Sequence, residues 1–376
     1  MWRYVDGEQE ILLCLYVDDI LCAVSDKIVY ERFFSFLKSR YPIGEANAVK
    51  EFLSVNIDQD LERDTTTIHQ SVYIEKLLTK FSTYRSLRTH SAPLPMNLRE
   101  CFSQNQVWCD EKFHSLYREI VGSLLYLSTW TRPDIAYAVS LLSRFLQQPS
   151  ELHLSLAFHV LGYLKRYPFY GLIYSRFANL QQLDSIQQSA LQVNGLLITP
   201  DEEYDHEHVE ENSDHVLLQG YADATWNDSP SDRKSTSGYI LLAGTTAVSW
   251  GSKRQPIIAL STAESEFISA TRCAQEACFL RMMFEFLGFP QQEATVIFED
   301  NKACVQMAQN PANASRTKHI DLREFYLKEL ERRNLVRLVH VSTNEQHADF
   351  LTKSLSHEKH RAHHRFVCGY PLCDPL

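Results

Sequence analysis

The N-terminal quarter of the chain alternates between short apolar runs and polar turns. The apolar runs EILLCLY and ILCAVSD flank Val17–Asp18–Asp19, which predicts a β-hairpin over residues 9–25. Residues 27–40 have helical periodicity, and residues 49–69 predict short strands joined by a turn at LERDTTT. SVYIEKLLTKF, residues 71–81, is typical of a short amphipathic helix.

The stretch from Leu116 to Lys165 predicts three helices. The middle helix begins at Thr131-Arg132-Pro133-Asp134, where a proline and an acid occupy the first turn, and it ends before Pro149. Residues 176–217 lack sustained periodicity and include DEEYDHEHVEENSDH, with eight acidic residues and no Lys or Arg. This composition indicates an interdomain linker or surface insertion, and its histidines read as solvated rather than metal-binding.

From about residue 217 to 355 the pattern predicts three strands, a long helix, a strand, two helices, a strand and a helix. Such an order is typical of an α/β domain in which an antiparallel trio meets parallel strands. The last twenty residues, 357–376, are rich in His and Cys. Their spacing matches no common zinc site, so a frayed basic helix is the favoured interpretation.

Composition narrows the class of protein. The chain has 376 residues, 44% of them apolar and 22% charged, as in globular proteins of two or three domains. No apolar run is long enough to span a membrane, and the first ten residues lack a signal-peptide pattern, which predicts an intracellular protein, in a cytoplasmic particle or the nucleus. Nine cysteines without a C-x-x-C pair suggest reduced thiols. The net charge of −10 is unfavourable for binding phosphates, but most of it lies in the acidic segment.

Three aspartates lie at informative positions of the predicted α/β domain. Asp223 falls inside the first strand, where Asp is uncommon. Asp300 ends the fourth strand, at the sheet edge where ligands bind in α/β domains, and Asp349 lies on the predicted last helix.

The long helix offers two candidates for a fourth acid, Glu264 and Glu266. Ser261-x-x-Glu264 has the form of a capping box, so Glu264 already has a structural role. We therefore assign Glu266 to the site. Individually each acid is more often a surface or capping residue, but four together suit two Mg²⁺ ions, which prefer oxygen ligands and promote phosphodiester hydrolysis.

Several strings in this region resemble the ribonuclease H domain of copia-type LTR-retrotransposon Pol polyproteins. They are DRKSTSGY, AVSWGSKRQ, ALSTAESEF, EDNKA, RTKHIDLREF and HADFLTK. The resemblance implies a mixed five-stranded sheet with helices, and hydrolysis of the RNA strand of RNA–DNA hybrids. It also implies a catalytic, metal-binding set, Asp223, Glu266, Asp300 and Asp349, for two Mg²⁺ or Mn²⁺ ions. The basic residues of these strings are expected to contact the hybrid: Arg233, Lys234, Lys253, Arg254, Arg316, Lys318 and His319.

The front half resembles the preceding parts of the same polyproteins. Tyr16-Val17-Asp18-Asp19 resembles the metal-binding hairpin of reverse transcriptases, with Asp18 as a ligand and Asp19 beside it, and residues 117–145 resemble the connection region. A further metal-binding Asp of that family lies well upstream of this hairpin, and only fifteen residues precede Tyr16. We therefore expect no polymerase activity from this chain alone, and expect its partner to be the missing polymerase segment or another Pol chain.

These interpretations divide the chain into five parts. They are a partial reverse-transcriptase palm and thumb (1–95), a helical connection region (96–180), an acidic linker (181–217), a ribonuclease H-like domain (218–356) and a tail (357–376). The alternative function is a remnant that binds a hybrid or primer–template without cutting it. That alternative predicts the loss of at least one acid, and all four are present.

Overall fold

The computed structural model places most of the chain. It describes residues 1–44, 47–96, 98, 110–175, 216–226, 233–309 and 318–370, with side chains from 325 onward in the last range. The predicted acidic linker therefore lies almost wholly outside the described residues, as does Arg316. No described helix has the length and apolar character needed to cross a membrane.

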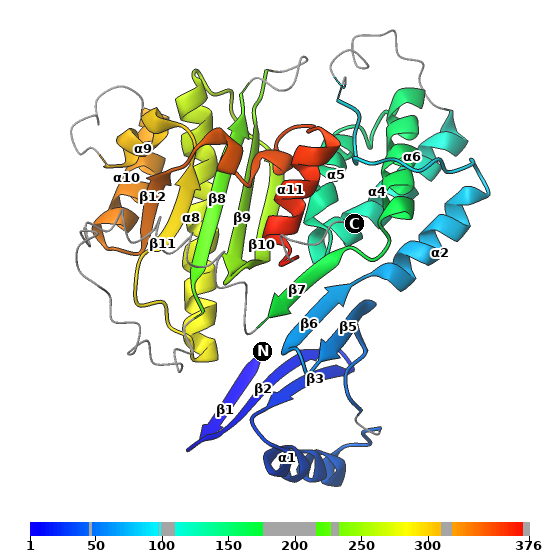
Figure 1. Ribbon diagram of the computed structural model, residues 1–376, viewed down its shortest axis with the longest axis vertical. Helices are drawn as coiled ribbons and strands as arrows, with labels where there is room; N and C mark the ends of the chain where they lie inside the picture. The colour runs from blue at the N-terminus through cyan, green and yellow to red at the C-terminus, as the bar shows by residue number, and fades with distance from the viewer. Residues whose placement is uncertain are drawn as a thin grey trace.

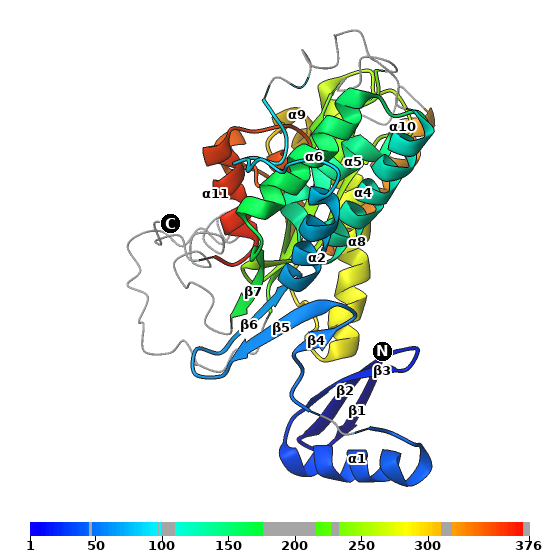
Figure 2. The same ribbon diagram turned by 90° about the vertical axis from the view of Figure 1, so that its right-hand side faces the viewer.

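The N-terminal segment forms a small antiparallel sheet packed against one helix. The sheet contains β1 (Trp2–Asp6), β2 (Gln9–Tyr16) and β3 (Asp19–Val24), and the helix is α1 (Lys27–Arg40). The hairpin predicted over 9–25 is confirmed, and β1 adds a third strand to it. In Figure 2 this unit lies at the bottom of the molecule, near the end of the long helix α8.

A second sheet joins segments that are far apart in the sequence. Its strands are β4 (Glu51–Phe52), β5 (Val55–Asp60), β6 (Thr65–His69) and β7 (Gly171–Ser175), in that order. Helix α2 (Ser71–Ser82) follows β6, whereas β7 comes after the three predicted helices of the middle region. This sheet therefore connects the first part of the chain to the helical region through hydrogen bonds between neighbouring strands.

The helical region has one continuous apolar core. It comprises α4 (Glu111–Trp130), the 3-10 turn η1 (Pro133–Ile135), α5 (Ala136–Ser143) and α6 (Glu151–Arg166). Pro133 begins η1 as predicted, and α5 continues directly from it. The predicted helices of this region and of residues 27–40 and 71–81 are thus confirmed.

The C-terminal part contains a mixed five-stranded sheet in the order β10-β9-β8-β11-β12. Its strands are β8 (Leu218–Thr225), β9 (Thr236–Ala243), β10 (Thr246–Arg254), β11 (Thr295–Glu299) and β12 (Val336–His340). The first three are antiparallel, and β8, β11 and β12 run parallel. The predicted α/β class, with an antiparallel trio meeting parallel strands, is confirmed.

Apolar layers cover both faces of this sheet because side chains alternate along each strand. On β9, Tyr239 and Leu241 face a core shared with α8 (Thr262–Leu287), α9 (Lys302–Gln309) and α10 (Lys318–Arg332). Ile240 and Leu242 face the opposite core, which includes Ala136 and Leu172. Figure 1 shows the helical region and α11 (His357–Val367) on that second side of the sheet.

Two predictions about the end of the chain are wrong. Asp349 lies on a one-turn 3-10 helix, η5 (Asp349–Leu351), preceded by a similar turn, η4 (Thr343–Glu345), and not on an α-helix. Within the described part of the tail, residues 357–370, the helix is not frayed, because α11 (His357–Val367) buries His360, His363 and His364. Sequence patterns identified α11 as helical but gave no indication of the surface it packs on.

Candidate active site

The strand register brings two of the predicted aspartates to one edge of the sheet. Phe298 of β11 pairs with Tyr221 of the parallel strand β8. Asp300 and Asp223 each lie two residues beyond this pair, so both occupy the carboxyl edge of neighbouring strands. Asp223 is 2% exposed, whereas Asp300 is half-buried.

The first turn of α8 supplies a glutamate to the same edge. Ser261 caps the helix by accepting a hydrogen bond from the Glu264 backbone N–H at 3.1 Å. The Glu264 carboxylate accepts one from the Leu260 N–H at 2.7 Å, which is a structural role just before the helix start. Glu266 extends into the acidic cluster instead. One oxygen each from Asp223, Glu266 and Asp300 lies within 4.8 Å of the others.

Asp349 approaches this cluster but pairs with a lysine. Its Oδ1 lies 2.6 Å from Nζ of Lys353, one turn further along. Among the described residues, Asp349 is outside the set of three closely grouped oxygens. Burial, and then the charge of Asp223, raise the pKa of Asp349 to about 7. The fourth carboxylate is thus close enough to be affected by the others.

Crowding of acids makes the site electrostatically unfavourable without a cation. The pKa of Asp223 is raised, mainly by burial. The pKa of Glu266 is raised well above its usual range, first by burial and to a smaller extent by the charge of Asp223. Oε2 of Glu266 is buried and has no hydrogen-bond partner in the part of the chain that the structure describes. Buried carboxylates that lack partners fit a site for hard divalent cations, which neutralise the charge and accept oxygen ligands.

Two residues of the site were missed by the sequence reasoning. Glu299 ends β11, is fully buried, and has a raised pKa because of burial and then Asp223. Lys353 follows Asp349 by four residues. Burial acts to lower the pKa of Lys353, but the charges of Asp223 and Asp349 outweigh burial, so the pKa is raised overall. Glu299 lies in the string EDNKA and Lys353 lies in HADFLTK. Their closeness in sequence to the predicted acids Asp300 and Asp349 was the signal that could have identified them.

The predicted nucleic-acid contacts fall partly within the described residues. Arg233 is exposed, and Nζ of Lys234 donates to the Pro256 carbonyl at 2.7 Å. Lys253 and Arg254 end the edge strand β10 and line, with Arg272 of α8, a depression of about 130 Å³. Lys318 and His319 belong to α10, but their side chains lie outside the described residues, and Arg316 is outside them altogether.

Asp18 and Asp19 lie apart from this site. Asp18 lies in the turn between β2 and β3, and Asp19 is the first residue of β3; both are exposed. The closely grouped oxygens in the described chain do not include them. The structure thus contains one acidic cluster at the C-terminal sheet and a separate exposed hairpin.

Comparisons with known proteins found similarities to different parts of the chain. Residues 1–94 match the family model described as reverse transcriptase (RNA-dependent DNA polymerase). Two solved ribonucleases H have related folds over part of the chain. One, isolated from compost by a metagenomic approach, is 15% identical, with 36% of this chain and 93% of that chain covered and a TM-score of 0.29. The N-terminal ribonuclease H domain of a Mycobacterium tuberculosis protein is 12% identical, with 39% and 96% covered and a TM-score of 0.28.

Several of the sequence relatives are transposon proteins. The Pol polyprotein from transposon TNT 1-94 of Nicotiana tabacum is 30% identical over 93% of this chain, and that from transposon RE1 of Arabidopsis thaliana is also 30% identical over 93%. This chain spans only 24% and 21% of those polyproteins. A putative transposon Ty5-1 protein of Saccharomyces cerevisiae is 30% identical, with 71% of this chain and 73% of that protein covered. By its similarity to these transposon proteins, the chain belongs to the copia-type retrotransposon Pol family, and its front part matches the reverse-transcriptase family model.

Proposed function

We propose that the domain formed by residues 218–356 hydrolyses the RNA strand of RNA–DNA hybrids in a metal-dependent reaction. The observation that carries this proposal is the grouping of Asp223, Glu266 and Asp300 within 4.8 Å at the carboxyl edge of the sheet. The choice of substrate and of strand follows from the resemblance to copia-type ribonuclease H domains and from membership of that family.

The residues present fit divalent cations. Asp223, Glu266 and Asp300 would hold them, and Asp349 would complete the set of four. Bound divalent ions would supply the chemistry of this class of reaction, namely activation of a water molecule and stabilisation of the leaving oxygen. The protein contributes a preorganised arrangement of oxygens, because Asp223 lies on β8, Glu266 lies on α8 and Asp300 directly follows β11.

The basic residues suit a backbone-binding role. Lys253 lies opposite Ser237 in the β9–β10 register, and Ala224 lies opposite Ser237 on the other side. The backbones of Lys253 on β10 and Ala224 on β8 are therefore separated by two strand spacings, or roughly 10 Å. Ala224 directly follows Asp223. Phosphate contacts at this distance would position a hybrid across the acidic edge without reading its sequence. Arg233, Lys234 and Arg254 would extend this contact, with Arg316, Lys318 and His319.

For the front part we propose a structural role in this chain. The hairpin bearing Asp18 and Asp19 is exposed, and the polymerase centre would need a further polymerase segment or another Pol chain. We accordingly divide the chain at residues 95, 180, 217 and 356, with the connection region between the polymerase-related part and the nuclease. Primer extension by this chain alone would contradict this view.

The decisive experiment is cleavage of a hybrid with both strands labelled, in Mg²⁺ or Mn²⁺. We expect cutting of the RNA strand only, with a loss of about 100-fold or more in Asp300→Asn, because metal-bound transition states are stabilised by several kcal/mol. Glu266→Gln should have the same effect. The matched variant Glu264→Gln should cut at a near-normal rate, with a small loss of stability from its cap.

Two outcomes would contradict the proposal. Well-folded protein that leaves the hybrid intact in both metals would exclude the proposed activity for this chain. Loss of cleavage in Glu264→Gln but not in Glu266→Gln would show that the helix ligand is misassigned.

A further inference from the structure

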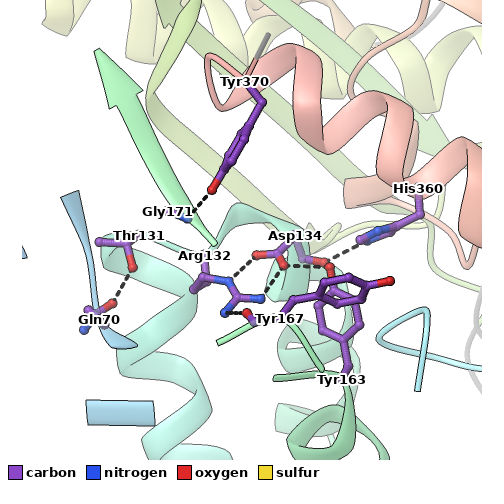
Figure 3. Close-up of polar contacts among 9 residues, drawn as sticks. All are labelled: Gln70, Thr131, Arg132, Asp134, Tyr163, Tyr167, Gly171, His360 and Tyr370. Atoms are coloured by element: carbon purple, nitrogen blue, oxygen red, sulfur yellow. Dashed lines mark hydrogen bonds and ion pairs between the residues drawn. The ribbon is translucent and has the colours of Figure 1, made fainter. Parts of the chain in front are cut away.

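A buried ion pair forms the centre of the contact between the helical region and the C-terminal domain. Arg132 donates through Nε to Oδ1 of Asp134 at 2.9 Å and through Nη2 to Oδ2 at 2.7 Å. Tyr163 donates to the same carboxylate at 2.8 Å, and Nη1 of Arg132 donates to the Tyr167 carbonyl at 3.0 Å. Figure 3 shows these side chains converging on Asp134. With both charges compensated and both side chains fully buried, the η1 backbone is firmly fixed.

This fixed backbone accepts a hydrogen bond from α11. The carbonyl oxygen of Asp134 lies 3.0 Å from Nε2 of His360, which is 4% exposed. Because a carbonyl can only accept, His360 carries a proton on Nε2. The bond therefore fixes both the ring orientation of His360 and its tautomer, as Figure 3 illustrates.

The other side of the His360 ring contacts the turn that carries the fourth carboxylate. Phe350, the residue after Asp349, lies edge-on to His360, with ring centroids 5.9 Å apart and an interplanar angle of 81°. Phe350 is 1% exposed, so its ring has little freedom to adopt another position. Asp134 and Phe350 also line a narrow gap between the two regions, together with Lys353.

On its inner side the same turn is attached to the C-terminal sheet. Gln346 donates through Nε2 to the Ala222 carbonyl at 2.8 Å, and its Oε1 accepts from the Ala348 N–H at 3.1 Å. Asp349 thus sits on a short turn held from within by β8 and from outside by His360. The other three carboxylates, in contrast, are placed by strands or by α8.

We propose that His360 is a positioning residue for Asp349: held by the Asp134 carbonyl, it packs on Phe350 and sets the turn that presents the fourth carboxylate to the metal ions. The helical region would then complete the metal site from outside the nuclease domain. This inference rests on the proposed function for its catalytic consequence, but its effect on metal binding can be measured without any substrate.

The test compares two identical substitutions on one helix of the full chain. His360→Phe keeps the aromatic ring but removes the donor to Asp134. His364→Phe is the control, since His364 is also buried, its ring stacks on Tyr170 with centroids 4.3 Å apart, and its ring nitrogens make no hydrogen bond to any described residue. Binding of Mn²⁺ is measured from the free-ion electron paramagnetic resonance signal, and cleavage of the hybrid is measured as a function of Mg²⁺.

We expect His360→Phe to weaken Mn²⁺ binding about tenfold, as is usual when an outer partner of a ligand is lost. The Mg²⁺ concentration for half-maximal cleavage should rise by a similar factor, while KM for the hybrid stays unchanged. His364→Phe should match the wild type in both measurements. A purely structural role would lower the unfolding midpoint but leave the metal dependence unchanged.

Three results would overturn the inference: normal Mn²⁺ affinity in folded His360→Phe, equal weakening in His364→Phe, or absence of Mn²⁺ binding by the wild type. If His360→Phe does not fold, Phe350→Leu tests the same contact from its other side. Normal Mn²⁺ affinity in Phe350→Leu would overturn the inference. If the wild type binds Mn²⁺ but does not cut the hybrid, only the proposed function fails, because the Mn²⁺ comparison still decides the role of His360.

Discussion

Lys353 places a positive charge inside a group of carboxylates. Its Nζ lies 2.6 Å from Asp349, and the charges of Asp223 and Asp349 raise its pKa despite burial. An internal ammonium of this kind reduces the repulsion among the acids and competes with an added cation for the same oxygens. The residue therefore contributes to stability and opposes metal binding at the same time.

Replacing Lys353 with Met should separate these two effects. In EDTA the variant should be destabilised by about 1–3 kcal/mol, because a buried carboxylate loses its partner. Saturating Mg²⁺ should raise its unfolding midpoint more than that of the wild type. Thermal unfolding with and without Mg²⁺ measures both quantities, and a smaller Mg²⁺-dependent increase in the variant would show that Lys353 supports the ion instead of competing with it.

The raised pKa of Asp349 predicts a pH dependence. A group whose pKa is higher in the folded protein stabilises the fold at low pH, and this contribution is lost as pH rises from about 4 toward the folded value of about 7. Buried histidines act in the opposite direction, since burial lowers the pKa of His363 to about 4. The comparison must therefore be made against a variant at Asp349.

In EDTA, the free energy of unfolding of the wild type relative to Asp349→Asn should decrease between pH 5 and pH 8. Urea denaturation at several pH values gives this difference directly. A difference that is constant with pH would mean that Asp349 titrates near its ordinary pKa.

At the scale of elements, β9 approaches the turn that contains η5 closely beside the site. Gly238 pairs with Asp223 across the β8–β9 register. A Cβ at Gly238 would lie 2.8 Å from Cβ of Leu351 and 2.7 Å from Cγ2 of Thr352. Only a residue without a side chain lets the turn carrying Asp349 approach the strand carrying Asp223.

Gly238→Ala should therefore destabilise the protein by about 1–3 kcal/mol, the usual effect of overpacking. Gly244→Ala is a useful contrast, because a Cβ there meets no atom within 4 Å, so any loss would come from its positive φ of 61°. Urea unfolding of both variants measures these losses. An unchanged free energy of unfolding in Gly238→Ala would show that η5 can move away from β9 without cost.

Local patterns predicted most elements of this chain but not their packing. The order of apolar and polar segments predicted β8 and β11, and the Ser261-x-x-Glu264 spacing separated the capping acid from Glu266. The turn at Asp349 and the burial of α11 were not predictable in this way. Both depend on partners such as Asp134, which lies 226 residues from His360 in the sequence and carries no periodic pattern that connects them.

For the whole molecule, the helical region and the C-terminal domain are joined by several direct bonds. Trp250 donates to the Ser128 carbonyl at 2.7 Å, Tyr174 donates to the Ala247 carbonyl at 2.7 Å, and Arg144 donates to Thr236 at 2.8 Å. Ala136 of the helical region and Leu172 of β7 also belong to one of the two cores of the sheet. The two regions should therefore unfold together.

Arg132→Met tests this coupling. It leaves the Asp134 charge buried without its partner, which typically costs about 3–5 kcal/mol. The loss should appear in one transition, with circular dichroism and tryptophan fluorescence giving the same midpoint. The double variant Arg132→Met, Asp134→Leu should be more stable than Arg132→Met alone, and two separated transitions in the wild type would show that the regions fold independently.

Helix α11 follows all four carboxylates in the sequence. This order matters for judging which genomic copies of such a retrotransposon encode a complete site. A gene copy interrupted between the codons for Asp349 and His357 would still encode every acid of the proposed site. Its product would lack α11, and with it the contacts from His360 to the Asp134 carbonyl and to Phe350. A search of genomic copies for intact acidic motifs would count such a copy as competent, whereas an unbroken reading frame through His360 is the stricter criterion.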